Sequence, residues 1–186
     1  GQKRLEEAEI SIRKAIELNP DDGNSHYNLG NILKDIGKIN EAFDCYIKAI
    51  EIDPSLPYIF QTISRFLRDS NQSIFNQGRL KKVFNLLLEK NNIRHNELFI
   101  IFNFLYGNEI INTLERYQVV FCEEKSLKLF INHEIIIKAL KKIPFMDTRL
   151  EKILTNVRKY ICDWISNNKE EIGFYQLQFI ISLGGQ

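Results

Sequence analysis

The residues with the most recognisable chemical pattern lie at His133–Ile137, where the sequence His-Glu-Ile-Ile-Ile begins like the HExxH helix of zinc proteases. In that motif two histidines four residues apart lie on one helical face and bind zinc. Ile137 occupies the position of the second histidine, so one imidazole remains. The segment therefore predicts a surface or half-buried histidine near a helix start rather than a metal site.

The three cysteines, Cys45, Cys122 and Cys162, are 77 and 40 residues apart and form no CxxC pair. This spacing favours small, buried thiols in a reducing cytoplasm over a zinc site or a disulfide framework. No phosphate-binding glycine loop or nucleophile motif is present either. We therefore predict no catalytic residue, no metal and no cofactor in this chain.

Composition narrows the class of protein further. Hydrophobic residues make up 44% and charged residues 26%, with 9 Gly, 4 Pro and a formal charge of +1. Such a balance is typical of a helical globular protein and gives no electrostatic reason to expect nucleic acid as a partner. The longest apolar stretch, residues 98–106, is far shorter than the ~20 residues of a membrane span. We expect a cytoplasmic protein without membrane contact.

An internal repeat organises the first third of the chain. Residues 5–22 and 39–56 align at a constant offset of 34 positions. The aligned pairs are Ala8 with Ala42, Ile12 with Tyr46, Ala15 with Ala49, Ile16 with Ile50, and Pro20 with Pro54.

Small residues at regular spacing have a packing role in this repeat. Two antiparallel helices approach closely only where side chains are small, so Gly30 and Ala42 are expected to mark a helix crossing. Ala49 would admit the next helix, and Pro54 would end the second helix because its ring cannot continue the hydrogen-bond ladder.

The spacing of these residues resembles the tetratricopeptide repeat. The resemblance rests on the following signature residues: Ala8, Ala15, Pro20, Leu29, Gly30, Ala42, Tyr46, Ala49 and Pro54. It implies an all-α solenoid of helical hairpins over residues 1–90, with a half repeat (1–22), a full repeat (23–56) and a degenerate repeat (57–90). The missing first helix of the half repeat leads us to expect a piece of a longer protein.

An irregular α-helical region is expected over residues 91–186. We predict helices over 57–69, 79–90, 95–107, 108–122, 126–143 and 148–166, and a last helix after Asn168. Residues 126–143 form either one helix or two short helices broken near Asn132. Gly107 would stop one helix and Asn108 would cap the next, while Thr148 and Glu151 would form a capping box. Residues 95–186, with the segments LEKILTNVRK (150–159) and QLQFIISLGGQ (176–186), resemble the linker of bacterial, particularly marine cyanobacterial, proteins in which tetratricopeptide repeats precede an S-adenosylmethionine-dependent methyltransferase domain.

Recognition is the chemistry that the resemblance implies, because the first helices of such repeats line a concave groove. Asn28 resembles the groove asparagine of the repeat arrays of O-linked N-acetylglucosamine transferases, which holds a peptide backbone. The alternative is an ordinary solvated helix face. The candidate groove residues are Asn24, Tyr27, Asn28, Asn31, Lys34, Tyr58, Gln61, Thr62, Arg65 and Arg68.

Three functions therefore stay open. The first is a non-catalytic protein- or peptide-binding scaffold of a larger protein. The second is an accessory or substrate-docking region of a methyltransferase or another transferase. The third is an oligomerisation module that pairs chains through the exposed half repeat, in which case a charge at Ile12 would abolish the pairing.

Overall fold

The computed structural model describes residues 2–112, 134–144 and 146–167, and within these residues all regular structure is helical. The predicted all-α fold is confirmed. The expected helices over 108–122, 126–143 and after Asn168 lie partly or wholly outside these residues, as do His133 and Cys122.

The chain divides into two compact units, Gly1–Val83 and Phe84–Gln186, with the division inside α5 (Gln77–Glu89). Our sequence-based boundary between residues 90 and 91, which followed the repeat pattern, stays a prediction.

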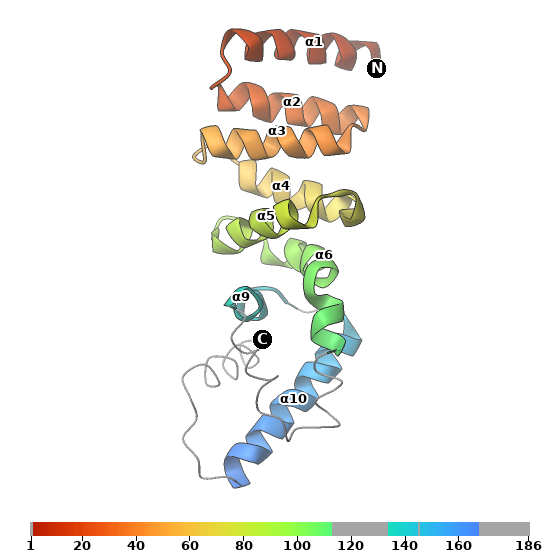
Figure 1. Cartoon of the computed structure of the whole chain (residues 1–186), viewed down its shortest axis with the longest axis vertical. Helices are drawn as coiled ribbons and strands as arrows, with labels where there is room; N and C mark the ends of the chain where they lie inside the picture. The colour runs from red at the N-terminus through yellow and green to blue at the C-terminus, as the bar shows by residue number, and fades with distance from the viewer. Residues whose placement is uncertain (1, 113–133, 145, 168–186) are drawn as a thin grey trace. The chain divides into compact units, whose positions relative to one another are not determined.

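The first unit is built from α1 (Gln2–Leu18), α2 (Gly23–Ile36), α3 (Ile39–Ile52) and α4 (Ile59–Asp69), with a short 3-10 turn, η1 (Gln72–Ile74), before α5. Helices α1, α2 and α3 lie in successive layers, with α2 and α3 forming an antiparallel hairpin (Figure 1). These layers are the helical hairpins that the repeat spacing predicts.

Local capping explains where α2 begins and ends. The Asp22 carboxylate accepts a hydrogen bond from the Asn24 backbone N–H at 3.1 Å, which satisfies a free donor of the first turn. At the other end Gly37 adopts a left-handed conformation, φ +91°, and its N–H donates to the carbonyls of Leu33 and Lys34. A residue with a β-carbon is strained in this conformation, so glycine suits the turn into α3.

Gly30 provides the close approach within the hairpin, with Tyr46 as its neighbour. A β-carbon added at Gly30 would lie 2.7 Å from Cε1 of the Tyr46 ring. The nearest atoms to Gly30 thus belong to Tyr46, whereas the sequence pattern suggested a crossing with Ala42. The Ala42 and Ala49 side chains are fully buried, as small residues between tightly packed helices should be.

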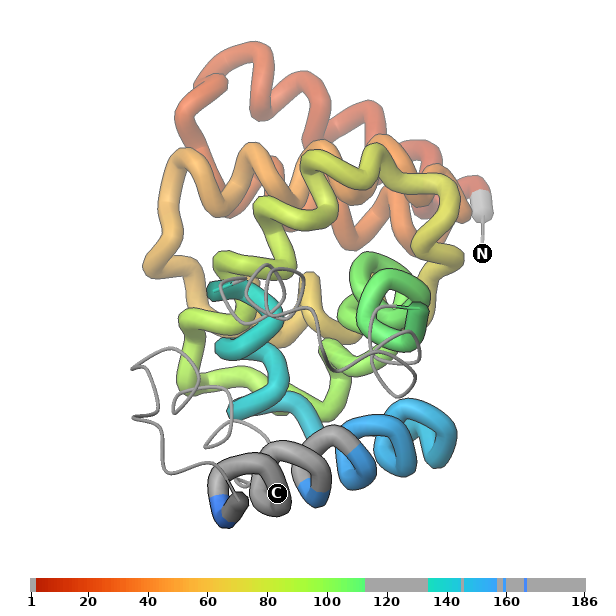
Figure 2. The backbone as a smooth tube through the Cα atoms, turned by 60° about the horizontal axis from the view of Figure 1, so that its bottom comes forward, coloured from red at the N-terminus to blue at the C-terminus, as the bar shows by residue number. Residues whose placement is uncertain are grey.

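An aromatic cluster packs α3 against α4 and the segment after η1. The Phe43 ring lies 4.7 Å from that of Phe75, and Phe66 lies 5.1 Å from Tyr46 in an edge-on contact. Figure 2 traces the chain from α3 through α4 and this segment toward α5. The longer connection after α4 therefore supplies Phe75 to the core.

Helix α4 begins later than predicted. The expected first turn at Pro57 is replaced by a turn in which Tyr58 adopts φ +62°, and the helix starts at Ile59. The Tyr58 carbonyl accepts the first α-helical hydrogen bond from Thr62 at 2.9 Å.

The second unit contains η2 (His95–Leu98), α6 (Phe99–Phe102), the π-helical turn η3 (Asn103–Gly107), α9 (Glu134–Lys142) and α10 (Thr148–Asn167). The rings of Phe84, Phe102 and Tyr106 pack together at centroid distances of 6.0 to 6.3 Å. Figures 1 and 2 show that α9 and α10 run in different directions, so these two described helices do not form a layered hairpin like those of the repeats.

Two predicted helix boundaries in this unit are wrong. Asn108 has right-handed helical angles, φ −65° and ψ −39°, so Gly107 does not stop the helix and Asn108 does not cap a new one. Gly107 instead packs against the Asn103 side-chain oxygen, where a β-carbon would clash.

The start of α10 is the second correction. The Asp147 carboxylate accepts hydrogen bonds from the backbone N–H groups of Arg149 and Leu150 at 2.8 and 3.0 Å. Asp147 therefore caps this helix in place of the predicted Thr148–Glu151 capping box, because its carboxylate already satisfies the donors of the first turn.

Candidate protein-binding face

The ten predicted groove residues lie on α2, on α4 and at Tyr58 just before α4. We call this surface the α2–α4 face. Its exposed members are Asn24, Asn28, Lys34, Tyr58 and Arg65, and its half-buried members are Tyr27, Asn31, Gln61, Thr62 and Arg68.

One hydrogen bond ties the two helices of this face together. The hydroxyls of Tyr27 and Thr62 lie 3.0 Å apart. The Tyr27 ring also packs against Tyr46, at a centroid distance of 6.1 Å. Tyr27 and Thr62 therefore hold α2 and α4 side by side, and their hydroxyls are already engaged within the fold.

A second hydrogen bond orients Asn31. The Tyr46 hydroxyl donates to Oδ1 of Asn31 at 2.9 Å, and the Tyr46 side chain is fully buried. Burial raises the pKa of Tyr46, so its hydroxyl keeps its proton and remains a donor. The Asn31 amide is consequently fixed by a group from the core.

The carboxyl-terminal ends of α2 and α4 carry charged pairs. Lys34 lies 3.2 Å from Asp35, and Arg68 lies 2.7 Å from Asp69. The hydrogen bond from Arg68 is the main cause that lowers the pKa of Asp69, and the charges of Arg65 and Lys34 act in the same direction. Each of the two helices therefore has a basic side chain paired with an aspartate in its last turn.

Three of the exposed residues of the face, Asn28, Tyr58 and Arg65, carry different polar groups. Asn28 is exposed in the middle of α2, and Tyr58 is 71% exposed at the start of α4. Arg65 is exposed, and its Nε–H donates to the Gln61 carbonyl at 3.3 Å. The arrangement offers amide, phenol and guanidinium groups that can donate to a peptide.

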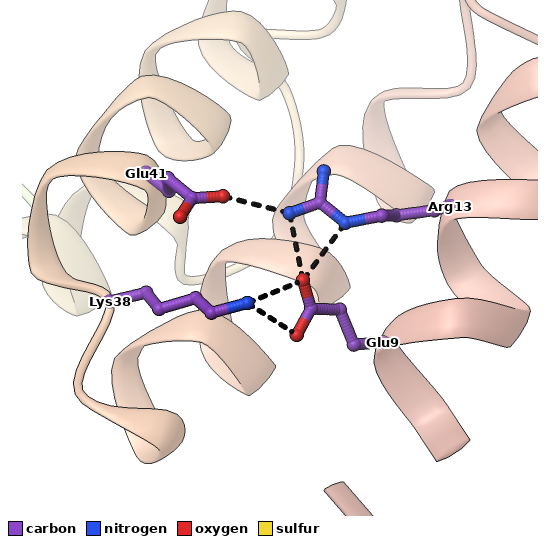
Figure 3. Close-up of polar contacts among 4 residues, drawn as sticks. All are labelled: Glu9, Arg13, Lys38 and Glu41. Atoms are coloured by element: carbon purple, nitrogen blue, oxygen red, sulfur yellow. Dashed lines mark hydrogen bonds and ion pairs between the residues drawn. The ribbon is translucent and has the colours of Figure 1, made fainter. Parts of the chain in front are cut away.

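An ion-pair cluster at the other side of the hairpin was missed by sequence reasoning. It consists of Glu9, Arg13, Lys38 and Glu41 (Figure 3). Lys38 Nζ donates to both Glu9 carboxylate oxygens at 3.0 Å, and Arg13 Nη2 lies 2.8 Å from both Glu9 and Glu41. These contacts join α1 to the turn before α3 and to α3 itself.

The repeat alignment contained the signal for this cluster. Glu9 aligns with Phe43 and Arg13 with Ile47, so charged residues replace apolar ones at positions where repeats meet. At these two positions α1 therefore makes ion pairs, whereas Phe43 of α3 contacts aromatic rings of the next elements.

The described residues Cys45 and His26 have roles in packing and hydrogen bonding. Cys45 is half-buried, and burial raises the pKa of its thiol to about 11, so the thiol stays protonated and unreactive near neutral pH. The His26 Nε2–H donates to the Pro20 carbonyl at 2.9 Å. Among the residues described, no group of three potential metal ligands occurs.

Comparison with known families identifies the repeats. Two family models, each described as tetratricopeptide repeat, match residues 1–22 and residues 23–56. Residues 1–56 therefore consist of tetratricopeptide repeats, as the sequence pattern predicts. Such repeats indicate a non-catalytic part of a protein that serves as a scaffold for protein interactions.

One curated relative extends the comparison. Over 94 residues the chain is 33% identical to Protein O-mannosyl-transferase TMTC3 of Homo sapiens. The match covers 49% of this chain and 10% of that protein, so the chain spans only a small part of the relative's length. No solved structure matches the chain.

The other sequence-based predictions concern the membrane, the cellular location and the partners of the chain. Within the described ranges, no helix is both long enough and apolar enough to cross a bilayer. The resemblance of residues 95–186 to a methyltransferase-associated linker, the cytoplasmic location, the absence of nucleic acid as a partner and the pairing of chains through α1 stay predictions.

Proposed function

We propose that the chain is a protein-binding scaffold that holds an extended peptide segment of a partner on the α2–α4 face. The observation that carries the proposal is the exposure of Asn28 and Arg65 on two first helices that Tyr27 and Thr62 hold together. An exposed amide has both a donor and an acceptor, which is the pair that a peptide backbone requires.

Peptide selection followed by chemical-shift mapping tests this function. The whole chain is immobilised and a random twelve-residue peptide library is selected on it. The best enriched peptide is then titrated into isotopically labelled chain. We expect enrichment, shift changes at Asn28 and Arg65, and none at Lys48, an exposed residue of α3 outside this face.

A substitution makes the test quantitative. Asn28→Ala should lower the affinity for the enriched peptide about fivefold, which corresponds to the loss of roughly one hydrogen bond. Lys48→Ala should change that affinity less than twofold. A library that yields no enriched peptide, or shifts that cluster away from the α2–α4 face, would contradict the proposal.

A second candidate is the substrate-docking region of a transferase, and the match to Protein O-mannosyl-transferase TMTC3 favours it. In that case the face would hold a protein acceptor for a catalytic domain elsewhere in the natural protein. Arg65→Gln in that whole protein would then reduce transfer to a protein acceptor and leave transfer to a small acceptor unchanged. Equal effects on both acceptors would argue against docking.

A further inference from the structure

We propose that the α2–α4 face selects peptide segments rich in aspartate and glutamate, because Asn31 and Arg65 present hydrogen-bond donors at matching positions of α2 and α4. The inference rests on the proposed function and adds the chemistry of the partner.

The first step concerns the direction of the Asn31 amide. Its Oδ1 accepts from the Tyr46 hydroxyl, which lies in the core. The Tyr46 ring has little freedom because it packs edge-on against Phe66 and fills the space over Gly30. With Oδ1 held by the core, the Nδ2 group and its two hydrogens are directed to the half-exposed side. Asn31 therefore acts as a fixed donor rather than as an amide free to turn over.

The second step concerns the charge on Arg65. No described carboxylate forms an ion pair with its guanidinium, and its Nε–H donates to the Gln61 carbonyl of the preceding turn. This back-bond holds the side chain along α4 and leaves the terminal nitrogens for an outside partner. By contrast, Lys34 and Arg68 each lie beside an aspartate of the same helix end.

The third step concerns the relative positions of the two donors. Asn31 and Arg65 are 34 residues apart, so they occupy the same position in neighbouring repeats. The bond between Tyr27 and Thr62, one turn earlier on each helix, fixes the lateral contact of α2 with α4. Lys34 lies in the last turn of α2 and Arg68 in the last turn of α4, so each helix contributes positive charge at this end.

The Asn31 amide and the Arg65 guanidinium donate hydrogen bonds, so they favour a ligand that carries hydrogen-bond acceptors. A carboxylate accepts hydrogen bonds in several directions and forms short, charge-assisted bonds with guanidinium and amide groups. A lysine- or arginine-rich peptide would find Oδ1 of Asn31 already engaged by the Tyr46 hydroxyl and would meet like charge at Arg65. We therefore assign acidic side chains of a partner protein to this position.

The experiment uses the enriched peptides of the selection described above. Their composition is compared with that of the starting library, and the best peptide is remade with glutamine for each glutamate and asparagine for each aspartate. Fluorescence anisotropy then gives affinities for the whole chain and its variants. We expect an excess of acidic residues and at least about tenfold weaker binding of the neutral peptide, as loss of one charge-assisted bond predicts.

Matched variants locate the effect. Arg65→Gln and Asn31→Asp should each lower the affinity for the acidic peptide about tenfold. The second variant does so because it replaces two donors by a carboxylate of nearly the same shape. Lys48→Gln removes the same charge from α3 outside the face and should change affinity less than twofold. Tyr46→Phe keeps the ring but removes the hydroxyl, so it should weaken the acidic peptide and leave binding of the neutral peptide unchanged.

The outcomes separate this inference from the proposed function. Enriched peptides without acidic excess, or acidic peptides insensitive to Arg65→Gln and Asn31→Asp, would overturn the acidic specificity while peptide binding stands. No enrichment on the native chain would overturn both. Circular dichroism of each variant establishes that a lost affinity does not come from an unfolded chain.

Discussion

Gly30 is the residue at which the space for a side chain is smallest in the repeat hairpin. Gly30→Ala gains helix propensity, about 1 kcal/mol, but places a β-carbon within 2.7 Å of the Tyr46 ring. Tyr46 cannot withdraw because Asn31 and Phe66 hold it. Overpacking of this kind costs about 1–3 kcal/mol, so we expect net destabilisation in urea unfolding.

A double-mutant cycle checks the physical reason. In a Tyr46→Leu background the steric conflict is absent, and Gly30→Ala should become neutral or stabilising. Asn28→Ala, at an exposed position of the same helix, provides the control and should change the unfolding free energy by less than about 0.5 kcal/mol. Equal costs of Gly30→Ala in both backgrounds would show that the tyrosine ring is not the cause.

Gly30 and its neighbours show what the sequence predicts and what it does not. The 34-residue offset identifies the helices and the small residues correctly, because close helix packing leaves a strong local pattern. The partner of Gly30 and the hydroxyl contact of Tyr46 with Asn31 depend on side-chain directions that spacing does not contain. Likewise, Asp147 and Thr148 are adjacent residues of equal capping type, and only the backbone geometry selects Asp147.

At the scale of elements, the interface of α1 with the following hairpin depends on ionised Glu9. The Glu9 residue is only 8% exposed, and the hydrogen bond from Lys38, followed by that from Arg13, lowers the pKa of its carboxyl below the usual 4.5. A lowered folded-state pKa adds stability that is fully present above about pH 4.5. That stability is lost as the pH falls through the folded-state pKa.

Glu9→Gln tests the contribution of this interface. Because Arg13 and Lys38 are themselves partly exposed, we expect a loss of about 1–2 kcal/mol at pH 7, measured by urea unfolding. The variant should also lose part of the acid sensitivity of the native chain. Glu41→Gln removes an exposed member of the cluster and should cost less than about 0.5 kcal/mol. Equal costs for both variants would mean that burial of Glu9 is unimportant.

In the second unit His95 of η2 bonds to the Leu88 backbone of α5 and is influenced by the charge of Lys142 at the end of α9. Burial, followed by the charge of Lys142, lowers the pKa of His95 below 6.5, while a hydrogen bond with the Leu88 backbone acts in the opposite direction. Lys142 Nζ donates to the same Leu88 carbonyl at 2.6 Å. A second cation is therefore disfavoured at this position.

The expected pH dependence follows from this lowered value. The unfolded chain binds a proton on His95 at higher pH than the folded chain, so stability falls as the pH decreases from about 6.5 through the folded-state pKa. An NMR titration of the imidazole should give a pKa below 6.5. Lys142→Gln should raise that pKa without restoring the ordinary value, because burial persists. An unchanged pKa in the variant would exclude the lysine charge as a cause.

At the scale of the whole molecule, charge is unevenly distributed along the sequence. Residues 1–56 carry a net charge of −4 and residues 57–186 a net charge of +5, and the calculated isoelectric point is 7.8. Near this pH the repulsion between copies is smallest, while opposite regions of two molecules attract each other. We expect weak, concentration-dependent association that is maximal near pH 7.8 and is reduced by salt.

Light scattering distinguishes this association from the predicted pairing through α1. Electrostatic association should largely disappear at about 0.3 M salt, where screening is effective within roughly 6 Å, and Ile10→Lys should leave its salt dependence unchanged. Pairing through the apolar surface of α1 should instead survive salt and be abolished by Ile10→Lys, because Ile10 is 70% exposed on α1 whereas Ile12 is half-buried. Electrostatic association predicts an apparent mass that rises with concentration and is largest near pH 7.8. An apparent mass that is independent of both concentration and pH would contradict it.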